Sequence, residues 1–444
     1  MTVAAPAPAP FAAELGRALA DAEGGPTAEL RRRAAERFRE LGYPGPKLEE
    51  WRFTNVGPVA RTDFEPAPRG YDRDQVERGI AHLRLAGALE LVFVDGRFAP
   101  ELSSDPRSQS SGLWAGNLAA VLETDAAAVE PWLGRRASFV ERPFAALSTA
   151  LFEDGAALLV PRRSVVERPV HVLFHTTGGL SPTAVFPRLL LVAGESSEVT
   201  LVETYSGEEG SVYLTAPVTE IVAEGDAKVD HYKLQRDSRE AFHLALLSVG
   251  CGRASSLTTQ TFSFGAAIAR HDVEGALEGE GAEATLNGLY LVNGRQLADF
   301  HMRVDHAAPH TTSHEMFKGV LDDRGRGVFN GRIHVHRQAQ KTDAKQTSRN
   351  LLLSEHALVN ANPQLEIYAD DVKCTHGSTV GQLDDLAVFY LRSRGIGLEA
   401  ARSLLTYAFA SDLVSRVKVP AVHELLQEYL LGWIPQGEIV REAI

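Results

Sequence analysis

Cysteine is almost missing from this sequence: Cys251 and Cys374 are the only two in 444 residues. Two cysteines cannot form a disulfide framework, and such sparse use is typical of proteins in a reducing compartment. Nowhere do about 18 consecutive apolar residues occur, which a membrane-spanning helix would need. The first residues show no basic segment followed by an apolar one, as a secretory signal would. We therefore expect a cytoplasmic protein that does not associate with a membrane.

Positive charge is also in deficit, with 45 lysine and arginine residues against 58 aspartate and glutamate residues and a net charge of -13. General binding to nucleic acid or to anionic membranes is therefore not expected. The common catalytic motifs are missing as well: there is no G-x-x-x-x-G-K-[ST] loop, no H-E-x-x-H, no G-x-S-x-G and no C-x-x-C. These absences argue against ATP binding through a Walker motif and against an enzyme of the familiar classes.

What the sequence does contain is a change of hydrophobic period along the chain. Residues 1–88 begin with a flexible Ala/Pro lead-in and continue with helical spacing, as in "PTAELRRRAAERFREL". Residues 89–395 consist mainly of short apolar or alternating segments that end at Gly, Asp, Asn or Pro, which is typical of strands. Residues 396–444 return to helical spacing. We therefore expect a β body between two helical regions.

The β body is large, because strand-like segments follow one another from residue 156 to about residue 390 without a convincing long helix. The alternation is clear where Ile333 and Val335 alternate with His334 and His336. A solenoid and a large sandwich both fit this pattern, since no repeat of fixed length is visible. The residue pattern therefore predicts a mainly β fold and leaves its architecture open.

The last helical region carries many large apolar side chains. They recur over residues 398–434 at intervals of three to four residues or multiples of these, and Pro420 precedes the second run. Two helices that cap the open end of the β body would explain them, and so would an element that docks another protein. The candidate docking residues are Leu404, Leu405, Tyr407, Phe409 and Trp433.

The later half of the chain is rich in histidine. His301, His306, His310 and His314 lie close together in the sequence, and a spacing of four could place three of them on one helix face to share a metal. Pro309 and the neighbouring Thr and Ser residues argue against a helix, so we expect these histidines to scatter. His334 and His336 share one strand face, where we expect them to be solvated or to stack on neighbours.

One motif combines the second cysteine with a histidine, in "DDVKCTHGSTVG" at residues 370–381. In an extended segment, Val372, Cys374 and His376 point to the same face, and residues two apart are separated by roughly 7 Å. A thiolate and an imidazole suit zinc, iron or copper(I), although two ligands do not complete a site. From the spacing alone, a small buried cysteine beside a hydrogen-bonded histidine is the favoured interpretation.

At this point a resemblance to a known family becomes visible. Residues 327–396, which include "LEIYADDVKCTHGSTVGQLDDLAVFYLRSRGI", closely resemble the SufB/SufD family of iron–sulfur cluster assembly proteins, and within it the SufD branch. The segments "PKLEEWRFTN" and "VDHAAPHTTSHEMFKGVLDDRGRGVFNGRI" agree with the same family. The resemblance implies a mainly β fold, a right-handed parallel β-helix with helical N- and C-terminal regions.

The resemblance also implies partners and a function. Such a chain is a non-ATPase scaffold that pairs with SufB through the two β-helices and binds the ATPase SufC through its C-terminal helical region. It helps iron entry or nascent cluster formation, so iron or a cluster is held only transiently and no metal is tightly bound in the isolated chain. Some complexes of this family bind reduced flavin, but no flavin motif is found here. A homodimer of the isolated chain is a further option.

The functional histidine of the family's K-C-[ST]-H-G motif corresponds to His376, facing SufB, with Cys374 as a less certain companion. The resemblance therefore reverses the interpretation drawn from spacing and predicts an iron or cluster site shared between subunits. Neither chain alone should supply enough ligands to complete such a labile site. The resemblance assigns SufC docking to the C-terminal apolar residues named above. One alternative is a purely structural partner of SufB and SufC. Another is a polysaccharide-acting β-helix enzyme, against which the Cys-x-His motif and the missing secretion signal argue.

Overall fold

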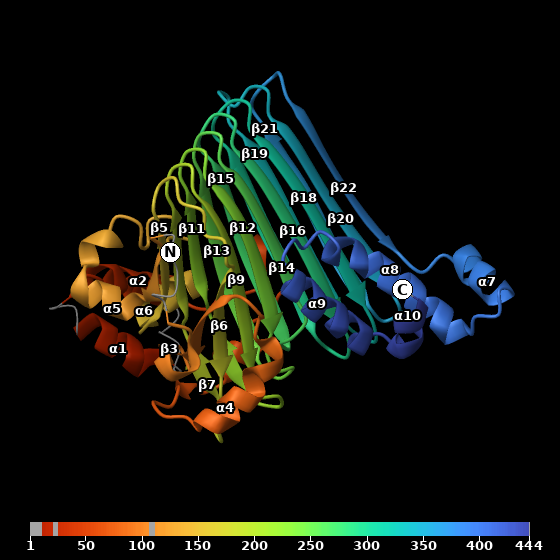
Figure 1. The fold of residues 1–444 in the computed structure, drawn as a ribbon, viewed down its shortest axis with the longest axis horizontal. Coiled ribbons are helices and arrows are strands. Elements are labelled where there is room, and N and C mark those ends of the chain that lie inside the picture. Colours follow the sequence, from red (N-terminus) through yellow and green to blue (C-terminus); the bar gives the residue numbers. More distant parts are fainter. Residues whose placement is uncertain (1–10, 21–24, 106–111, 444) are drawn as a thin grey trace.

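A computed structural model describes residues 11–20, 25–105 and 112–443, and it shows a long parallel β-solenoid with helices at both ends of the chain (Figure 1). The solenoid has about eight turns built from two sheets. From β11 to β22, successive strands alternate between these sheets, so that the chain coils along one axis. The mainly β fold with helical terminal regions is confirmed, and the sandwich alternative is wrong. The Ala/Pro lead-in lies outside the described residues.

Each sheet is assembled from strands far apart in the sequence. The twelve-stranded sheet contains β1 (Glu65–Pro66), β4 (Trp114–Asn117), β5 (Gly155–Val160), β7 (Thr183–Val185), β8 (Arg188–Ala193), β10 (Tyr213–Thr215), β11 (Val218–Ala223), β13 (Phe242–Cys251), β15 (Ile268–Leu277), β17 (Leu297–His306), β19 (Arg326–Val335) and β21 (Leu358–Ile367). The ten-stranded sheet contains β2 (Leu89–Val94), β3 (Arg97–Phe98), β6 (Val170–Thr176), β9 (Glu198–Gly207), β12 (Lys228–Arg236), β14 (Ser256–Ser263), β16 (Glu283–Val292), β18 (Thr312–Leu321), β20 (Asp343–Leu352) and β22 (Lys373–Gly381).

The helices lie before, between and after these strands. In the first part of the chain they are α1 (Ala12–Ala20), α2 (Ala28–Leu41), α3 (Gly57–Arg61), α4 (Arg73–Ile80), α5 (Leu118–Thr124) and α6 (Pro143–Leu151). Short 3₁₀ turns are η3 (Glu49–Trp51), η4 (Ala81–Leu83), η5 (Pro100–Leu102) and η7 (Ala126–Ala128). The chain ends with α7 (Asp385–Ser393), α8 (Leu398–Val414), α9 (Pro420–Trp433) and α10 (Gly437–Ala443). No helix among the described residues is long and apolar enough to cross a membrane.

One corner of the coil has the same backbone conformation in successive turns. Asp226, Ala254 and His310 occupy it in three of them, with φ of 59°, 52° and 58°. Their N–H groups donate to carbonyl oxygens of the next turn, such as that of Asp226 to Arg253 at 2.8 Å. Residues as different as aspartate, alanine and histidine fill this left-handed position, which costs non-glycine residues some strain. The repeat is therefore one of backbone geometry, which explains why none is visible in the sequence.

The interior of the solenoid contains a continuous stack of rings that runs along its axis. The centroids of neighbouring rings lie 4.8 to 5.2 Å apart. The stack consists of Phe93, Phe174, Tyr205, His243, His271, Phe300, Phe317 and Phe329. The stack passes from the ten-stranded sheet, at Phe93, Phe174 and Tyr205, to the twelve-stranded sheet, at His243, His271 and Phe300, so its rings connect both sheets and add to the apolar burial.

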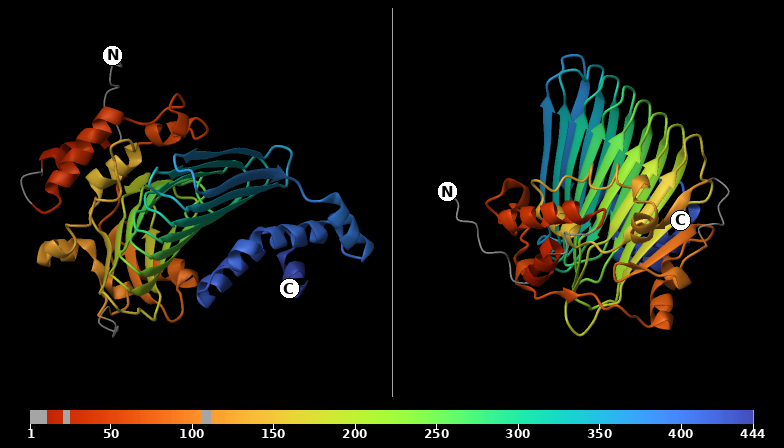
Figure 2. Two further views of the ribbon diagram at one scale, coloured as in Figure 1. Left: turned by 90° about the horizontal axis from the view of Figure 1, so that it is seen from above. Right: turned by 90° about the vertical axis from the view of Figure 1, so that its left-hand side faces the viewer.

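The two helical regions cover opposite outer faces of the solenoid (Figure 2). Helices α1, α2 and α6 pack on the early strands of the twelve-stranded sheet, where Trp51 is buried under the Arg270 guanidinium at 3.8 Å from its ring centroid. The nearby Phe53 is exposed. Helices α8 and α9 pack on the ten-stranded sheet, with Leu413 and Leu426 against its apolar outer residues. These helices cover a face of that sheet, so the prediction that they cap the open end of the β body is wrong.

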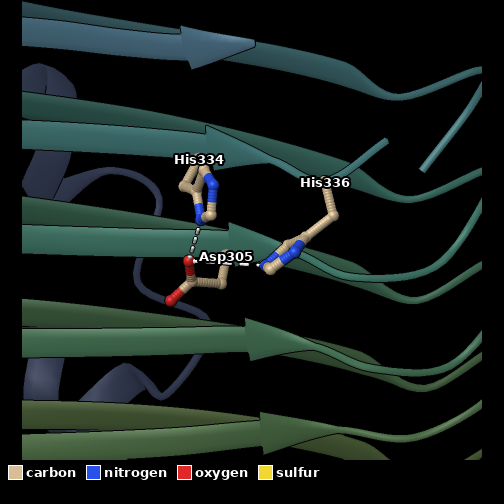
Figure 3. Close-up of side chains that lie close together, drawn as sticks. All are labelled: Asp305, His334 and His336. Carbon is tan, nitrogen blue, oxygen red and sulfur yellow. Dashed lines mark hydrogen bonds and ion pairs between the residues drawn. The ribbon is translucent and has the colours of Figure 1, made fainter. Parts of the chain in front are cut away.

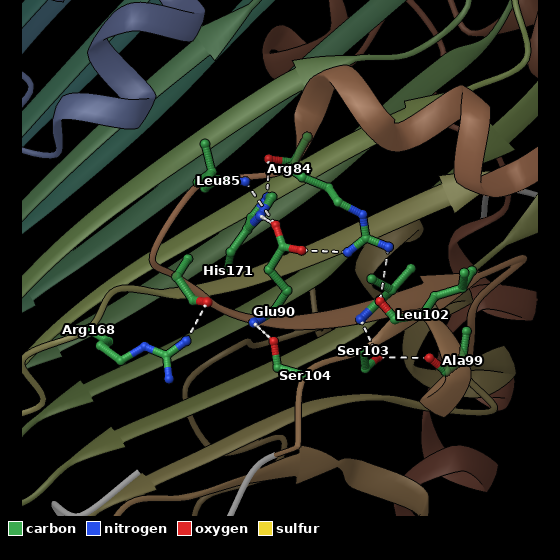
Figure 4. Close-up of polar contacts among 12 residues, drawn as sticks. Arg84, Leu85, Glu90, Ala99, Leu102, Ser103, Ser104, Arg168 and His171 are labelled. Carbon is green, nitrogen blue, oxygen red and sulfur yellow. Dashed lines mark hydrogen bonds and ion pairs between the residues drawn. The ribbon is translucent and has the colours of Figure 1, made fainter. Parts of the chain in front are cut away.

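The N-terminal end of the solenoid is closed. Strands β3 and β4 run antiparallel to β2 and β5 and occupy the positions of further parallel neighbours. Beside them the buried Glu90 carboxylate accepts hydrogen bonds from the Leu85 N–H at 2.9 Å and from Arg84 Nη1 at 2.5 Å, and it contacts His171 Nδ1 at 3.1 Å (Figure 4). Burial by itself would raise the pKa of Glu90, but His171 and these donors lower it to about 2. The first turn is thus locked by a satisfied ionic network.

The C-terminal end is open, because β21 and β22 each have a strand neighbour on one side only. Every second side chain of β19 and β20 is buried, whereas β21 and β22 have no fully buried residue. Pro363 lies within β21, where a missing N–H is tolerated because an edge strand has a free side. The last turn therefore presents an unpaired edge on each sheet.

Candidate functional site

The motif singled out from the sequence lies on this last turn. Strand β22 holds both Cys374 and His376, and they pair across the strands with Ala344 and Gln346 of β20. Because Ala344 and Gln346 point into the solenoid and are buried, Cys374 and His376 occupy the same inward face one turn later. No further turn covers them. The Cys374 thiol is half-buried, and burial raises its pKa, whereas the His376 imidazole is exposed.

A row of polar side chains continues from His376 into the interior. In register, Glu315 of β18 pairs with Gln346 of β20, which pairs with His376 of β22. Gln346 Nε2 donates to Glu315 Oε2 at 2.5 Å, and its own Oε1 has no partner among the described residues. Burial raises the pKa of Glu315 to about 7, although the bond from Gln346 opposes the rise. A carboxyl, an amide and an imidazole thus form one row that ends in solvent.

Sequence reasoning missed Glu315 and Gln346, although a signal existed. The two residues are 31 positions apart, which is about one turn of the coil. In a solenoid, residues one turn apart and on the same face become neighbours, so the spacing of Glu315, Gln346 and His376 predicts their row once the fold is known. Because no repeat is visible in the sequence, the length of one solenoid turn could not be derived from it. The row of Glu315, Gln346 and His376 could therefore not be predicted.

The ligand set around Cys374 and His376 is incomplete. Among the described residues, three metal-binding side chains come together only at Asp305, His334 and His336, on a different face. Cys374 instead packs against a small apolar cluster that includes Ile333, Val335 and Ala344. A thiol and an imidazole at an exposed edge can contribute ligands to a shared site but cannot enclose an ion.

The other four histidines scatter, as expected from the residues between them. His306 is buried and hydrogen-bonded to Thr311 and Ser313, and burial lowers its pKa to about 4. His310 occupies a corner with positive φ, and His314 is exposed on β18. His301 contacts Asp299 at 3.1 Å. These positions do not form a common metal site.

The five residues predicted to dock a partner are all half-buried. Four of them pack on apolar clusters of the chain itself, and only Leu405 belongs to none. Leu404 packs beside Leu431 and Ile434, Tyr407 and Phe409 pack toward the ten-stranded sheet, and Trp433 joins both groups. Trp433 also lines a groove of about 710 Å³ that contains Arg236, Arg239 and Glu428. Four of the five residues therefore help to hold the C-terminal helices on the solenoid.

Large exposed apolar side chains concentrate instead near the open end. Of fifteen such residues in the described part of the chain, eight lie between residues 358 and 398. They are Leu358, Ile367, Tyr368, Val380, Leu386, Phe389, Tyr390 and Leu398. Helix α7, which follows β22 directly, buries none of its residues. Exposed apolar residues gathered beside unpaired strand edges are typical of an interface.

Fold and site together define an open-ended parallel β-solenoid that carries helices on its outer faces and potential ligands on its last strand. Two models of known protein families match the chain. Residues 17–172 match the SufBD protein N-terminal region, and residues 174–409 match the SufBD core domain of SUF system FeS cluster assembly. The chain belongs to this SufBD family of iron–sulfur cluster assembly proteins.

Individual relatives are similar over nearly the whole chain. An iron–sulfur cluster assembly SufBD family protein of Synechocystis sp. is 33% identical over 409 residues, which cover 90% of this chain and 89% of that protein. The iron–sulfur cluster assembly protein SufD of Escherichia coli is 29% identical, over 94% of this chain and 95% of its own. SufD of Bacillus subtilis is 27% identical, over 89% and 91%. The resemblance identified from the sequence motifs is confirmed.

Proposed function

We propose that this chain is the SufD-type, non-ATPase scaffold subunit of an iron–sulfur cluster assembly complex, in which it pairs with SufB through its open end and helps iron entry or nascent cluster formation there. The observation that carries the proposal is the uncovered last turn, with His376 and Cys374 on its unpaired strand. Iron and the nascent cluster are cargo in this proposal, and none is expected to stay tightly bound to the isolated chain.

The open edges support a partner of the same architecture. A strand edge offers a row of unpaired N–H and C=O groups that another strand can satisfy. Strands β21 and β22 offer two such edges side by side, flanked by exposed Ile367 and Val380. A second solenoid with its own open turn would match both edges at once, and SufB is that partner in our proposal. A second copy of this chain could use the same edges when SufB is absent.

The incomplete ligand set supports a shared and transient site. His376 has an exposed imidazole without a hydrogen bond to any described residue, so both ring nitrogens are free to bind an ion or a water. Cys374 adds a thiol on the same face, but burial raises its pKa and favours the protonated form. The imidazole is therefore the stronger ligand of the two, and the remaining ligands must come from the partner.

The test compares three variants in the assembled complex. His376→Ala removes the imidazole without disturbing strand pairing, so it should co-purify with SufB and SufC while cluster formation falls at least about tenfold. Cys374→Ser should have a milder effect. His314→Ala, an exposed histidine on the outward side of the same sheet, is the matched control and should behave as wild type. Cluster content is measured by iron and sulfide analysis.

If His376→Ala assembles and forms clusters at the wild-type level, the chain is a purely structural partner of SufB and SufC. If the purified chain fails to capture SufB at all, the pairing itself is wrong. ATP turnover that follows the purified chain through several columns would contradict its non-ATPase role.

We further propose that the SufC ATPase docks on the C-terminal helices. Removing α8 to α10 would expose apolar outer residues of the ten-stranded sheet, such as Phe262 and Leu289, so a surface substitution is the sharper test. Leu405→Asp changes a half-exposed residue that belongs to none of the apolar clusters, and it should weaken SufC capture without unfolding the chain. Phe389→Asp on α7 is its matched control. Loss of SufC with Phe389→Asp alone would move the docking site to α7.

A further inference from the structure

A second group of potential ligands lies on the outer face of the twelve-stranded sheet, where strands β17 and β19 end. Asp305 Oδ1 lies 2.8 Å from His334 Nδ1 and 3.8 Å from His336 Nε2 (Figure 3). The centroids of the two imidazole rings are 4.3 Å apart. One ligand atom from each of the three side chains lies within 4.8 Å of the others. Two imidazoles and one carboxylate thus converge on one point.

The fold holds each of the three in place. Asp305 and His334 are direct cross-strand partners, and both point outward because Val304, Ile333 and Val335 point into the core. His336 follows the end of β19, and its N–H donates to the His306 carbonyl at 3.0 Å. Two of the three ligands therefore lie on paired strands, and the third is fixed by a backbone hydrogen bond directly after one, which gives the metal site the support that its ligands require.

Neighbouring side chains orient the ligands. Arg303 donates to both carboxylate oxygens of Asp305, from Nε to Oδ2 at 2.8 Å and from Nη2 to Oδ1 at 3.1 Å, and Oδ1 also faces both imidazoles. The Tyr368 ring meets His334 edge to face at 5.4 Å. All three ligand residues are partly exposed, with side-chain exposures of 24% for Asp305, 18% for His334 and 38% for His336, so an ion can reach them from solvent.

A surface hydrogen bond between His334 and Asp305 would explain part of this geometry. It does not explain His336, whose Nε2 approaches the same carboxylate oxygen at 3.8 Å, beyond hydrogen-bond distance. Ligand atoms bound at about 2.0–2.2 Å to one ion lie roughly 3–4 Å from each other. The 3.8 Å separation suits an ion between the groups, whereas the 2.8 Å contact is a hydrogen bond that has to lengthen slightly when the ion binds.

We propose that Asp305, His334 and His336 form a binding site for a divalent transition-metal ion of the Zn²⁺ or Fe²⁺ class. Imidazole nitrogen favours these ions over Mg²⁺ or Ca²⁺, and two histidines with one carboxylate leave coordination positions open for water or an incoming ligand. Glu366 of β21 is the cross-strand partner of His334 on its other side, and its carboxylate contacts Arg332 Nε at 3.5 Å. Such a site captures an ion from solvent and can release it again.

This site is separate from the one at the open end. It lies outside the solenoid wall, whereas Cys374 packs on Ile333 and Val335, whose side chains are on the inner side of β19. It is complete within one chain and needs no partner subunit. Its existence therefore does not depend on the function proposed above.

The experiment uses the full chain without a histidine tag. Zn²⁺ titration calorimetry and the visible absorption of bound Co²⁺ are measured for wild type, Asp305→Asn, His334→Gln and His336→Gln. Wild type should bind one ion, and each substitution should weaken binding at least about tenfold, since even residues that only orient metal ligands change affinity by that much. His314→Gln, an exposed strand histidine away from the site, is the matched control and should bind like wild type.

Two further results decide the case. All three ligand side chains are partly exposed, so the variants should keep the wild-type unfolding temperature without metal and lose only the metal-dependent increase. Unchanged Co²⁺ and Zn²⁺ affinity in His336→Gln would overturn the proposal. So would the absence of a one-to-one isotherm in wild type, or a Co²⁺ signal that disappears in His376→Ala instead, since that ion would lie at the open end.

Discussion

The two ends of the solenoid use the same coil but finish it in opposite ways. At the N-terminal end, antiparallel β3 and β4 close the sheets, and the buried carboxylate of Glu90 is bonded to Arg84, Leu85 and His171. At the C-terminal end, β21 and β22 are unpaired on one side and their inward-facing side chains are half-buried or exposed. An end whose only role is stability would resemble the N-terminal end. The C-terminal end leaves two strand edges unpaired, which is the feature that the proposed pairing with a second solenoid requires.

The largest effect is expected from one substitution made at both ends. Leu189 of β8 is fully buried near the closed end, whereas Leu358 of β21 is 49% exposed at the open end, and both belong to the twelve-stranded sheet. Leu189→Ala should lower the free energy of unfolding by about 2–5 kcal/mol, because it removes buried methyl groups and leaves a cavity. Leu358→Ala should change it by less than about 0.5 kcal/mol. Urea unfolding of the two variants measures the difference, and equal losses would show that Leu358 is covered in solution.

The fold was readable in outline from the sequence because it depends on period and composition. Alternation around Ile333 and Val335 predicted strands, and the helical spacing of the last residues predicted helices. The solenoid itself was not predicted from the pattern, since the positive-φ corner accepts Asp226, Ala254 and His310 alike and leaves no sequence repeat. Its architecture was expected only from the family resemblance.

The candidate sites were predictable to different degrees. Cys374 and His376 lie two residues apart, so their common face follows from strand geometry alone. Glu315 and Gln346, and likewise Asp305 and His334, meet only through cross-strand register, 31 and 29 positions apart. Apolar spacing also named Tyr407, Phe409 and Trp433 for docking, but spacing does not tell a face that binds a partner from one that packs on the chain's own sheet.

The second prediction concerns the ionic network of the closed end. The pKa of Glu90 is lowered to about 2, below its ordinary value of 4.5, so the carboxylate stabilises the native state above the ordinary pKa and this contribution is lost as the pH falls toward 2. Glu90→Gln should therefore cost on the order of 2–3 kcal/mol at pH 7 and much less near pH 3. Exposed Glu167→Gln is the control. A cost that does not change between the two pH values would show that Glu90 acts through packing rather than charge.

The third prediction is the opposite pH dependence of stability, for a residue near the open end. The pKa of Glu315 is raised to about 7, so its native state retains a proton that the unfolded chain releases above about 4.5. Stability is therefore lost as the pH rises from about 4.5 through 7, and Glu315→Gln should restore roughly 1–2 kcal/mol at pH 8 but almost nothing at pH 4. The new amide oxygen can still accept the bond from Gln346. Destabilisation at pH 8 would mean that the carboxylate is ionised in the fold and holds Gln346 through its charge.

The smallest effect is a difference in reactivity between the two thiols, which leaves stability unchanged. Cys251 is fully buried in the middle of the solenoid, and burial raises its pKa to about 12. Cys374 is half-buried on the last turn, and its pKa is raised in the same direction by burial. Since only the thiolate attacks a disulfide reagent, we expect native protein to lose one thiol per chain slowly and the second only on unfolding.

Covering the open end should then protect the single reactive thiol. Adding SufB should slow the reaction of Cys374, whereas Cys251 stays unreactive with or without it. If neither thiol of the native chain reacts at high protein concentration but one reacts after dilution, a second copy of the chain covers the same strand edge. Equal and rapid reaction of both thiols would contradict the comparison itself, because the middle of the solenoid would then open as readily as its last turn.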